Sequence, residues 1–259
     1  MQQAPGAFDV LGVRVDVVQI GDVIHHMRQW IDAKGPCRWI AVTGMHGVMV
    51  AQDDAGFRNT LQAADLVVPD GISLVWLGRM RGRRLQRRVY GPDLIEGFFG
   101  HPVATGTRHF LYGGGPGVAE SLASVLERRY PSAHIVGTIT PPFRSLNAEE
   151  EDDVVAQINA AAPDVIWVGL STPKQELWMQ RFRIRLRAPV LVGVGAAFDF
   201  ISGRVRQAPR WLRDAGLEWL WRLVHEPRRL WRRTVLMGPR FVVRSIAQVL
   251  KESVSKRGQ

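Results

Sequence analysis

The chain alternates short apolar runs with segments of helical spacing, and this alternation constrains its fold more than any other feature. Six runs carry the β-branched and aromatic residues typical of buried strands. They cover residues 39–42, 66–68, 109–112, 134–138, 164–170 and 189–195. Strands and helices alternating at this spacing predict parallel βαβ units, so we expect an α/β fold with helices on both faces of a parallel sheet. We also expect a small β-element over residues 8–20 and one helix over residues 48–61.

An acidic residue follows the second of these strands. Pro69 ends the strand because it cannot donate to a sheet ladder, and Asp70-Gly71 then turns the chain. Open parallel sheets bind ligands beyond the carboxyl ends of their strands, so Asp70 stands where a general base would lie. Aspartate is also a preferred helix N-cap, and these two residues alone favour a cap for the helix that starts at residue 72.

A glycine-rich turn, with glycines at 113, 114, 115 and 117, joins the strand at 109–112 to a helix. Bare backbone N–H groups at a helix start can bind a phosphate, which makes Gly113, Gly114, Gly115 and Gly117 candidate ligand-binding residues. The dinucleotide template Gly-x-Gly-x-x-Gly is not met, because Val118 stands where the third glycine belongs. The turn therefore favours a nucleotide diphosphate over a nicotinamide dinucleotide. A tight strand-to-helix turn that needs small residues explains it equally well.

Two later turns carry polar side chains at the same predicted edge of the sheet. Lys174 and Gln175 follow the strand at 164–170, where they contact a nucleotide or sugar or else cap a helix. Asp199 lies in the small-residue turn at 196–203, which suits close approach of a ligand. It is a second carboxylate candidate, or a residue that satisfies backbone N–H groups.

The composition fits an ordinary globular protein of a reducing compartment. Apolar residues make up 46% of the 259 residues, and Cys37 is the only cysteine, which excludes an internal disulfide. Asp9 and Asp16 interrupt the N-terminal region, so we expect no signal peptide. No apolar run is long enough for a transmembrane helix. The sequence shows no metal-binding cluster, and we expect neither a metal nor a cofactor.

The net charge of +10 lies entirely in the C-terminal part. Residues 201–259 hold 14 of the 34 basic residues and four of the 24 acidic ones, so residues 1–200 are neutral. Arginine mixed with tryptophan and aliphatic residues there favours contact with an anionic membrane over helices that merely pack on the core. We expect a globular domain over residues 1–207 and a basic amphipathic helical appendage over residues 208–259.

Several stretches together resemble the WecG/TagA/CpsF family of bacterial glycosyltransferases. The resemblance runs from about residue 8 to residue 241, and each segment alone is modest. Their shared order and spacing make the match specific. The matching segments are residues 64–71, 91–94, 112–120, 172–176, 193–200, 216–223 and 226–230.

The resemblance implies a Rossmann-like catalytic domain with a C-terminal appendage, acting at the inner face of the cytoplasmic membrane. It implies inverting, metal-free transfer of a sugar, such as glucose or N-acetylmannosamine, from a UDP-sugar to a polyprenyl-diphosphate-linked sugar. The residue that matches the family's proposed base is Asp70. The matching pocket residues are Thr43, Arg88 and Gln175, and the appendage arginines implied to bind a diphosphate are Arg222, Arg229 and Arg232.

The chain departs from the family pattern in two places. Met45 stands where the family commonly has asparagine, with His46 beside it as a substitute polar group or a structural residue. Gln207 replaces the arginine of an Arg-Ala-Pro near the end of the core. The first change lies in the expected sugar pocket, so the identity of the transferred sugar stays open.

Two other functional classes remain as alternatives. A nucleic-acid-binding protein would use the basic tail, but the chain carries no recognised nucleic-acid module, so we expect no nucleic-acid partner. A nicotinamide-dependent oxidoreductase is disfavoured by Val118. We expect a UDP-sugar, a lipid-diphosphate-linked saccharide and an anionic membrane surface as partners, in cell-surface polysaccharide or exopolysaccharide synthesis. The oligomeric state is open, a homo-oligomer included.

Overall fold

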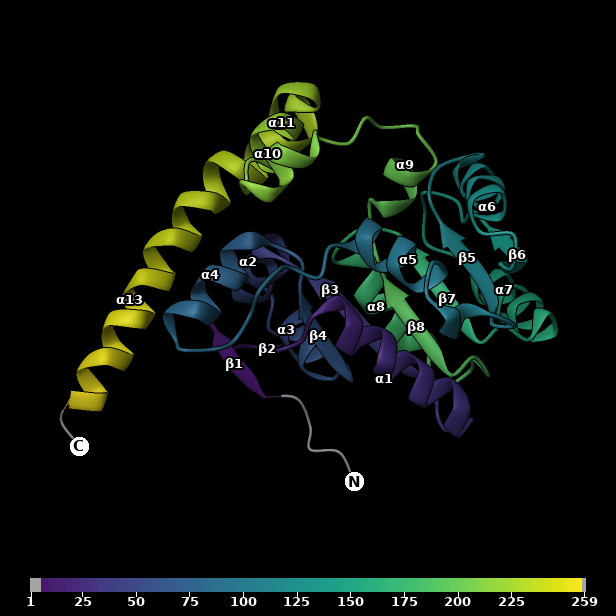
Figure 1. Ribbon diagram of the computed structural model, residues 1–259, viewed down its shortest axis with the longest axis horizontal. Helices are drawn as coiled ribbons and strands as arrows, with labels where there is room; N and C mark the ends of the chain where they lie inside the picture. Colours follow the sequence, from purple (N-terminus) through teal and green to yellow (C-terminus); the bar gives the residue numbers. More distant parts are fainter. Residues whose placement is uncertain (1–5, 258–259) are drawn as a thin grey trace.

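A six-stranded parallel sheet forms the centre of the protein (Figure 1). The structure is a computed structural model that describes residues 6–257, apart from the side chains of residues 229, 232, 233 and 253–257. The strand order is β4-β3-β8-β7-β5-β6, and each neighbouring pair runs parallel. The strands are β3 (Arg38–Thr43), β4 (Leu66–Pro69), β5 (Arg108–Gly113), β6 (His134–Ile139), β7 (Val165–Gly169) and β8 (Val190–Gly193). The expected α/β, Rossmann-like fold is confirmed.

Helices cover both faces of this sheet because successive strand residues point to opposite sides. In β3, Trp39 and Ala41 enter one hydrophobic layer, whereas Ile40 and Val42 enter the other. The first layer includes α2 (Met45–Asp53), α3 (Ala55–Gln62), α4 (Ile72–Met80), α7 (Ala148–Ala161) and α8 (Lys174–Phe182). The second includes α1 (Ile20–Ala33), α5 (Gly91–Phe99), α6 (Val118–Arg129) and α9 (Ala197–Ile201), with the short 3-10 helix η1 (Pro102–Ala104) after α5.

Two local expectations meet different outcomes. The small β-element is confirmed as a hairpin of β1 (Ala7–Val10) and β2 (Val13–Asp16), which packs on the first layer. The single helix expected over residues 48–61 is wrong: it is two helices that meet at Asp54. Asp54 adopts an extended backbone, and its side chain accepts a hydrogen bond from the N–H of Phe57, so it caps α3. The capping preference of aspartate therefore overrides the continuous apolar spacing.

The connections open a crevice at the carboxyl edge of the sheet. Strands β3 and β8 are neighbours, but the chain leaves β3 into α2 on the first layer and leaves β8 into α9 on the second. Where the connections after two neighbouring strands leave to opposite faces of a parallel sheet, the carboxyl ends of these strands stay uncovered. Ligands bind at such points. The topology thus predicts a site beyond the ends of β3 and β8.

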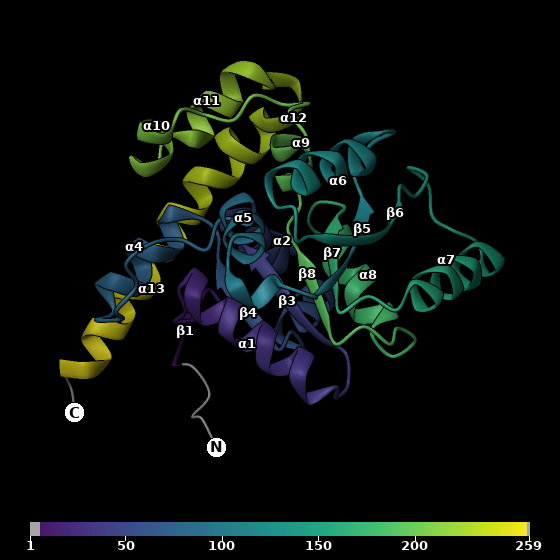
Figure 2. The ribbon, with the colours of Figure 1, turned by 45° about the vertical axis from the view of Figure 1, so that its right-hand side comes forward.

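The C-terminal appendage is helical and lies against the sheet domain. It comprises α10 (Arg210–Asp214), α11 (Glu218–His225), α12 (Pro227–Trp231), the π-helix η2 (Arg232–Met237) and α13 (Gly238–Arg257). Helices α10 and α11 lie beyond the carboxyl edge of the sheet, and α13 runs back beside α4 (Figures 1 and 2). Phe241 of α13 is buried in the first layer, and Glu252 pairs with Arg81 at 2.8 Å. The boundary at residues 207 and 208 stays a prediction.

Candidate active site

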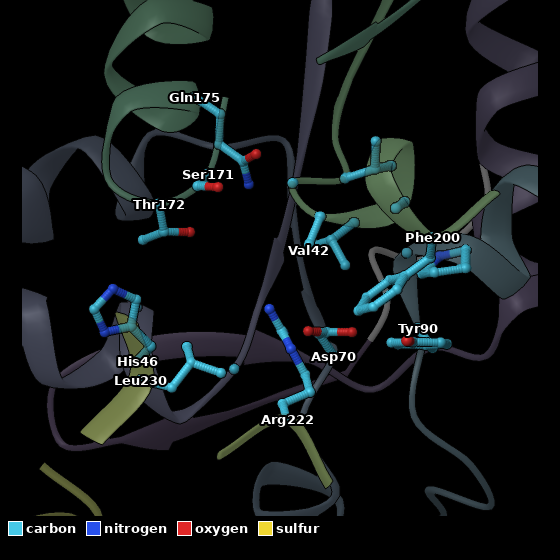
Figure 3. A pocket seen from close by; sticks show the side chains of 18 residues that line it. Val42, His46, Asp70, Tyr90, Ser171, Thr172, Gln175, Phe200, Arg222 and Leu230 are labelled. Carbon is cyan, nitrogen blue, oxygen red and sulfur yellow. The ribbon is translucent and has the colours of Figure 1, made fainter. Parts of the chain in front are cut away.

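A cavity of about 240 Å³ lies at the predicted crevice, beyond the ends of β3 and β8. Its walls come from the segments that follow β3, β4, β7 and β8, and Arg222 and Leu230 of the appendage complete them (Figure 3). With Tyr90, Gly91 and Pro92 at the start of α5, the cavity gathers six described parts of the chain. Four predicted site residues line it, namely His46, Asp70, Gln175 and Arg222.

Asp70 lies in the cavity wall rather than at a helix cap. Helix α4 has Gly71 as its N-cap residue and no side-chain capping bond. The backbone N–H of Asp70 instead donates to the carbonyl of Thr43 at 2.8 Å, which fixes the residue beside the end of β3. Figure 3 shows the Asp70 carboxylate and the Arg222 guanidinium both projecting into the cavity. The capping interpretation is wrong, and the position fits a general base.

A buried network joins this wall to the appendage. Glu218, at the start of α11, accepts a hydrogen bond from Arg88 at 2.6 Å and from the Tyr90 hydroxyl at 2.7 Å. Gln207 donates to the same hydroxyl at 3.1 Å. The Arg88 guanidinium lies 4.1 Å from the centre of the Tyr90 ring, within cation–π range. Tyr90 lines the cavity, so the appendage holds one of its walls.

Charge around this network fixes two protonation states. Burial raises the pKa of Tyr90, and the neighbouring Glu218 raises it further. Tyr90 therefore stays neutral, and its hydroxyl donates a hydrogen bond to Glu218. Burial lowers the pKa of Arg88, but Asp70 and Glu218 outweigh burial and hold that pKa above its ordinary value. Arg88 is therefore a permanent cation close enough to Asp70 to stabilise the ionised carboxylate.

The turn after β7 forms the opposite wall of the cavity. Ser171 has φ 66°, a left-handed conformation that costs a non-glycine residue about 1–3 kcal/mol and is typical of functional turns. Glu176, fully buried behind this turn, accepts from Thr172 at 2.7 Å and from Gln175 at 3.1 Å. Burial raises the pKa of Glu176, while these hydrogen bonds oppose the rise. The buried Oε1 atom of Gln175 has no hydrogen-bond partner among the described residues, so the amide offers an acceptor.

Two predicted residues, Thr43 behind the cavity and Arg222 in its lining, have different surroundings. Thr43 is buried directly behind it: a Cβ added to the lining residue Gly47 would fall 2.1 Å from the Thr43 hydroxyl oxygen. Arg222 lies with its guanidinium 5.2 Å from the centre of the Phe200 ring and 3.6 Å from Glu226. Thr43 thus shapes the cavity, and Arg222 carries a positive charge into it.

Several other predicted residues lie outside the cavity. Lys174 is exposed at the start of α8, and Asp199 lies on α9 without lining the cavity. The glycines at 113, 114, 115 and 117 also lie outside it. A Cβ at Gly113 would come within 2.7 Å of the backbone of Gly169, so close packing of β5 on β7 requires that glycine. Roles of Lys174, Asp199 and the glycine turn in ligand binding stay predictions.

Arg229 and Arg232 belong to α12 and η2, but their side chains lie outside the described residues. Tyr90 lines the cavity and Glu218 pairs with it, but neither is among the sequence-based candidates. Both lie in matched family segments or next to them, yet neither has a residue type or spacing that singles it out. Their pairing depends on a contact across 128 residues, which local patterns do not carry.

Comparison with known proteins identifies the family. The model of the glycosyl transferase WecG/TagA/CpsF family matches residues 8–255. The chain belongs to this family. An N-acetylglucosaminyldiphosphoundecaprenol N-acetyl-beta-D-mannosaminyltransferase of Bacillus subtilis strain 168 is 32% identical over 204 residues, covering 79% of this chain and 75% of that protein. The protein of the same name from Bacillus spizizenii strain W23 is 31% identical over 192 residues, covering 74% and 72%.

Membership in the WecG/TagA/CpsF family makes the cavity the candidate active site of a glycosyltransferase. Within the part of the chain that the structure describes, no three His, Cys, Asp or Glu side chains cluster closely enough to hold a metal ion. No described helix is both long and apolar enough to cross a bilayer. Among the described residues, the carboxylate and the guanidinium that line the cavity are those of Asp70 and Arg222; Glu226 pairs with Arg222, and the Arg88–Glu218 pair lies nearby.

Proposed function

We propose that this glycosyltransferase moves a sugar from a UDP-sugar to a polyprenyl-diphosphate-linked N-acetylglucosamine, with inversion and without a metal ion. The observation that carries the proposal is the carboxylate of Asp70 in a cavity that also holds the positive charge of Arg222. The names of the two Bacillus relatives support the acceptor, because both include an N-acetylglucosaminyl diphosphoundecaprenol. Those names make N-acetylmannosamine the first sugar to test.

In the proposed reaction Asp70 accepts the proton of an acceptor hydroxyl. The hydroxyl oxygen forms a bond to the anomeric carbon of the donor while the bond from that carbon to UDP breaks, which inverts the centre. The electron pair of the broken bond leaves with UDP, and the proton on Asp70 passes to solvent. General-base help of this kind contributes about 10²–10⁴-fold.

Arginine side chains support departure of UDP in this scheme. Negative charge develops on the leaving diphosphate, and preorganised cations lower the barrier to its departure. Arg222 reaches the cavity from the appendage, and Arg88 lies behind Asp70. The scheme needs no metal ion, so turnover should persist in EDTA. A loss restored by Mg²⁺ would overturn the metal-independent part of the proposal.

A thermal-shift screen tests the donor. A ligand that binds only the folded state raises the melting temperature by mass action. UDP-N-acetylmannosamine, UDP-glucose, UDP-N-acetylglucosamine and UDP-uronic acids are compared with UDP alone. We expect one UDP-sugar to raise the melting temperature above the value with UDP and to be transferred to a lipid-linked N-acetylglucosamine. A screen in which no UDP-sugar shifts the melting temperature or is consumed would contradict the proposal.

The membrane contact expected of the basic tail is part of the proposal. Large apolar side chains of the appendage are exposed among arginines, which is typical of helices that lie in an anionic membrane interface. They include Trp211, Trp219, Leu220, Val224, Trp231, Val242, Val243, Ile246 and Leu250. This surface would bring the cavity close to an acceptor that is itself anchored in lipid.

A further inference from the structure

A second and larger hollow lies beside Ile72, two residues after Asp70. It has a volume of about 750 Å³ and is bounded by the start of α1, by α4, by the loop before α5 and by α10 of the appendage. Five arginines line it, namely Arg79, Arg87, Arg88, Arg210 and Arg213, together with the carboxylates of Asp93, Glu96 and Asp214. Among these arginines only Arg88 is a sequence-based candidate, as a pocket residue that the family resemblance implies. We call this hollow the arginine groove.

The groove is close to the proposed base. The chain passes from Asp70, in the cavity wall, through Gly71 to Ile72, which lines the groove. Arg88 also lines the groove and interacts electrostatically with Asp70. The groove and the cavity therefore lie on neighbouring stretches of the chain, although they share no lining residue among the described ones.

The arginine side chains of the groove differ in the hydrogen bonds and ion pairs that they already make. Arg79 donates to the carbonyls of Leu85 and Gln86, which fixes the loop, and Arg213 pairs with Asp93 at 3.2 Å. Arg87 is exposed, and its guanidinium pairs with no carboxylate among the described residues. A bond of 2.9 Å from its backbone N–H to the Gln19 side chain holds the residue beside the start of α1. Arg87 is thus positioned and available for an anion.

An apolar surface lies next to these charges. Trp76 of α4 is 52% exposed and lines the groove together with Ile20 and Ile72. A flat indole face packs well against the apolar side of a sugar ring or against an isoprenoid chain. Guanidinium groups, in turn, bind phosphate oxygens with charge-assisted hydrogen bonds. The groove combines the two surfaces that a glycosyl diphosphate ester requires.

We propose that the arginine groove binds the saccharide diphosphate of the acceptor, with Arg87 on the diphosphate and Trp76 on the sugar or the first isoprenoid unit. This rests on the proposed function and assigns its acceptor to a site separate from the donor cavity. The cavity of about 240 Å³ is small for two substrates, whereas the groove, at about 750 Å³, is about three times as large. The acceptor sugar would then present its hydroxyl to Asp70 from the groove.

Direct binding tests the groove without relying on turnover. The probe is N-acetylglucosamine diphosphate carrying a short isoprenoid chain, titrated calorimetrically into the full-length protein without donor. Arg87→Gln removes a charged hydrogen bond at an exposed site, so the dissociation constant of the acceptor probe should rise about 3- to 10-fold. Trp76→Ala removes the apolar contact and should raise the same constant by about as much. Arg84→Gln is the matched control, because Arg84 is exposed on the same loop and does not line the groove.

UDP-sugar binding is measured on the same variants. We expect the dissociation constant of the UDP-sugar to stay within twofold of the wild-type value in every variant. If Arg87→Gln and Trp76→Ala leave acceptor binding within twofold, or weaken donor binding instead, the groove assignment is overturned. Wild-type protein that binds the acceptor probe in this groove but transfers no sugar would contradict the proposed function alone.

Discussion

At the scale of single residues, Asp70 and Gln175 bring polar side chains into the cavity at the carboxyl edge of the sheet. Asp70 follows a strand that proline ends, and the structure places it in the cavity wall although local preference favours a cap. Gln175 lines the same cavity, but the adjacent Lys174 points to solvent because the first turn of α8 rotates neighbouring side chains to different sides. Strand ends are predictable from the sequence, whereas the direction of each side chain depends on packing.

Glu176 gives a prediction about stability and pH. Burial raises its pKa above the ordinary value of 4.5, so the folded protein binds a proton that the unfolded chain releases. Stability conferred by the neutral group is complete below pH 4.5 and falls as pH rises through the higher pKa of the folded state. Glu176→Gln keeps a neutral amide, so its free energy of unfolding should decline less over that range.

Urea unfolding at several pH values measures this difference. The free energy of unfolding of Glu176→Gln, relative to that of wild type, should increase as pH rises from 4.5 toward neutrality. Parallel stability curves for the two proteins would show that Glu176 is ionised in the folded state and would contradict the prediction.

At the scale of elements, the parallel strands and most helices follow from hydrophobic patterns, because each pattern is local. The break between α2 and α3 was missed, since one capping side chain at Asp54 outweighs continuous apolar spacing. The tail was correctly expected to be helical, but its docking was not predictable. That docking depends on Glu218, which contacts Arg88 and Tyr90 across about half of the chain.

The Glu218 network predicts how docking and activity are linked. Glu218→Gln removes the charge that holds Arg88, and hydrogen bonds to charged groups contribute about 1.5–3 kcal/mol. For a chain of this size that loss should lower the melting temperature by roughly 3–10 °C. It should also reduce kcat, because Arg88 lies beside Asp70.

Asp93→Asn is the control for this variant. It breaks another contact between the appendage and the sheet domain, the pair with Arg213, but Asp93 is half exposed and does not line the cavity. Its effect on the free energy of unfolding should stay below about 1 kcal/mol. Equal losses of stability in the two variants, measured by calorimetry, would refute a special role for Glu218.

At the scale of the whole molecule, charge and exposed apolar area lie together on the appendage. The sequence predicted this from composition alone, since the entire excess of +10 falls within residues 201–259. The family resemblance implied a binding role for Arg222 of the same appendage, but only the folded chain shows which side chains surround it in the cavity. One segment therefore serves the proposed membrane surface and the proposed active site together.

Vesicle binding checks the membrane surface. We expect the protein to sediment with vesicles rich in phosphatidylglycerol and much less with phosphatidylcholine vesicles, and high salt should weaken the binding. Trp219→Ser removes a half-exposed indole and should weaken binding roughly tenfold. Phe143→Ser, which removes an exposed aromatic ring outside the appendage, should not change it. Equal loss of vesicle binding in both variants, or no loss in either, would argue against the appendage as the surface that contacts the membrane.

Turnover of Asp70→Asn, measured at saturating UDP-sugar and lipid-linked acceptor, tests the central claim most directly. The amide keeps the shape of the side chain but cannot accept the hydroxyl proton, so kcat should fall about 10²–10⁴-fold with the melting temperature and donor affinity preserved. Asp153→Asn, a change of equal charge on the exposed face of α7, should leave kcat unchanged. An Asp70→Asn enzyme that keeps wild-type turnover would contradict the assignment of Asp70 as the base.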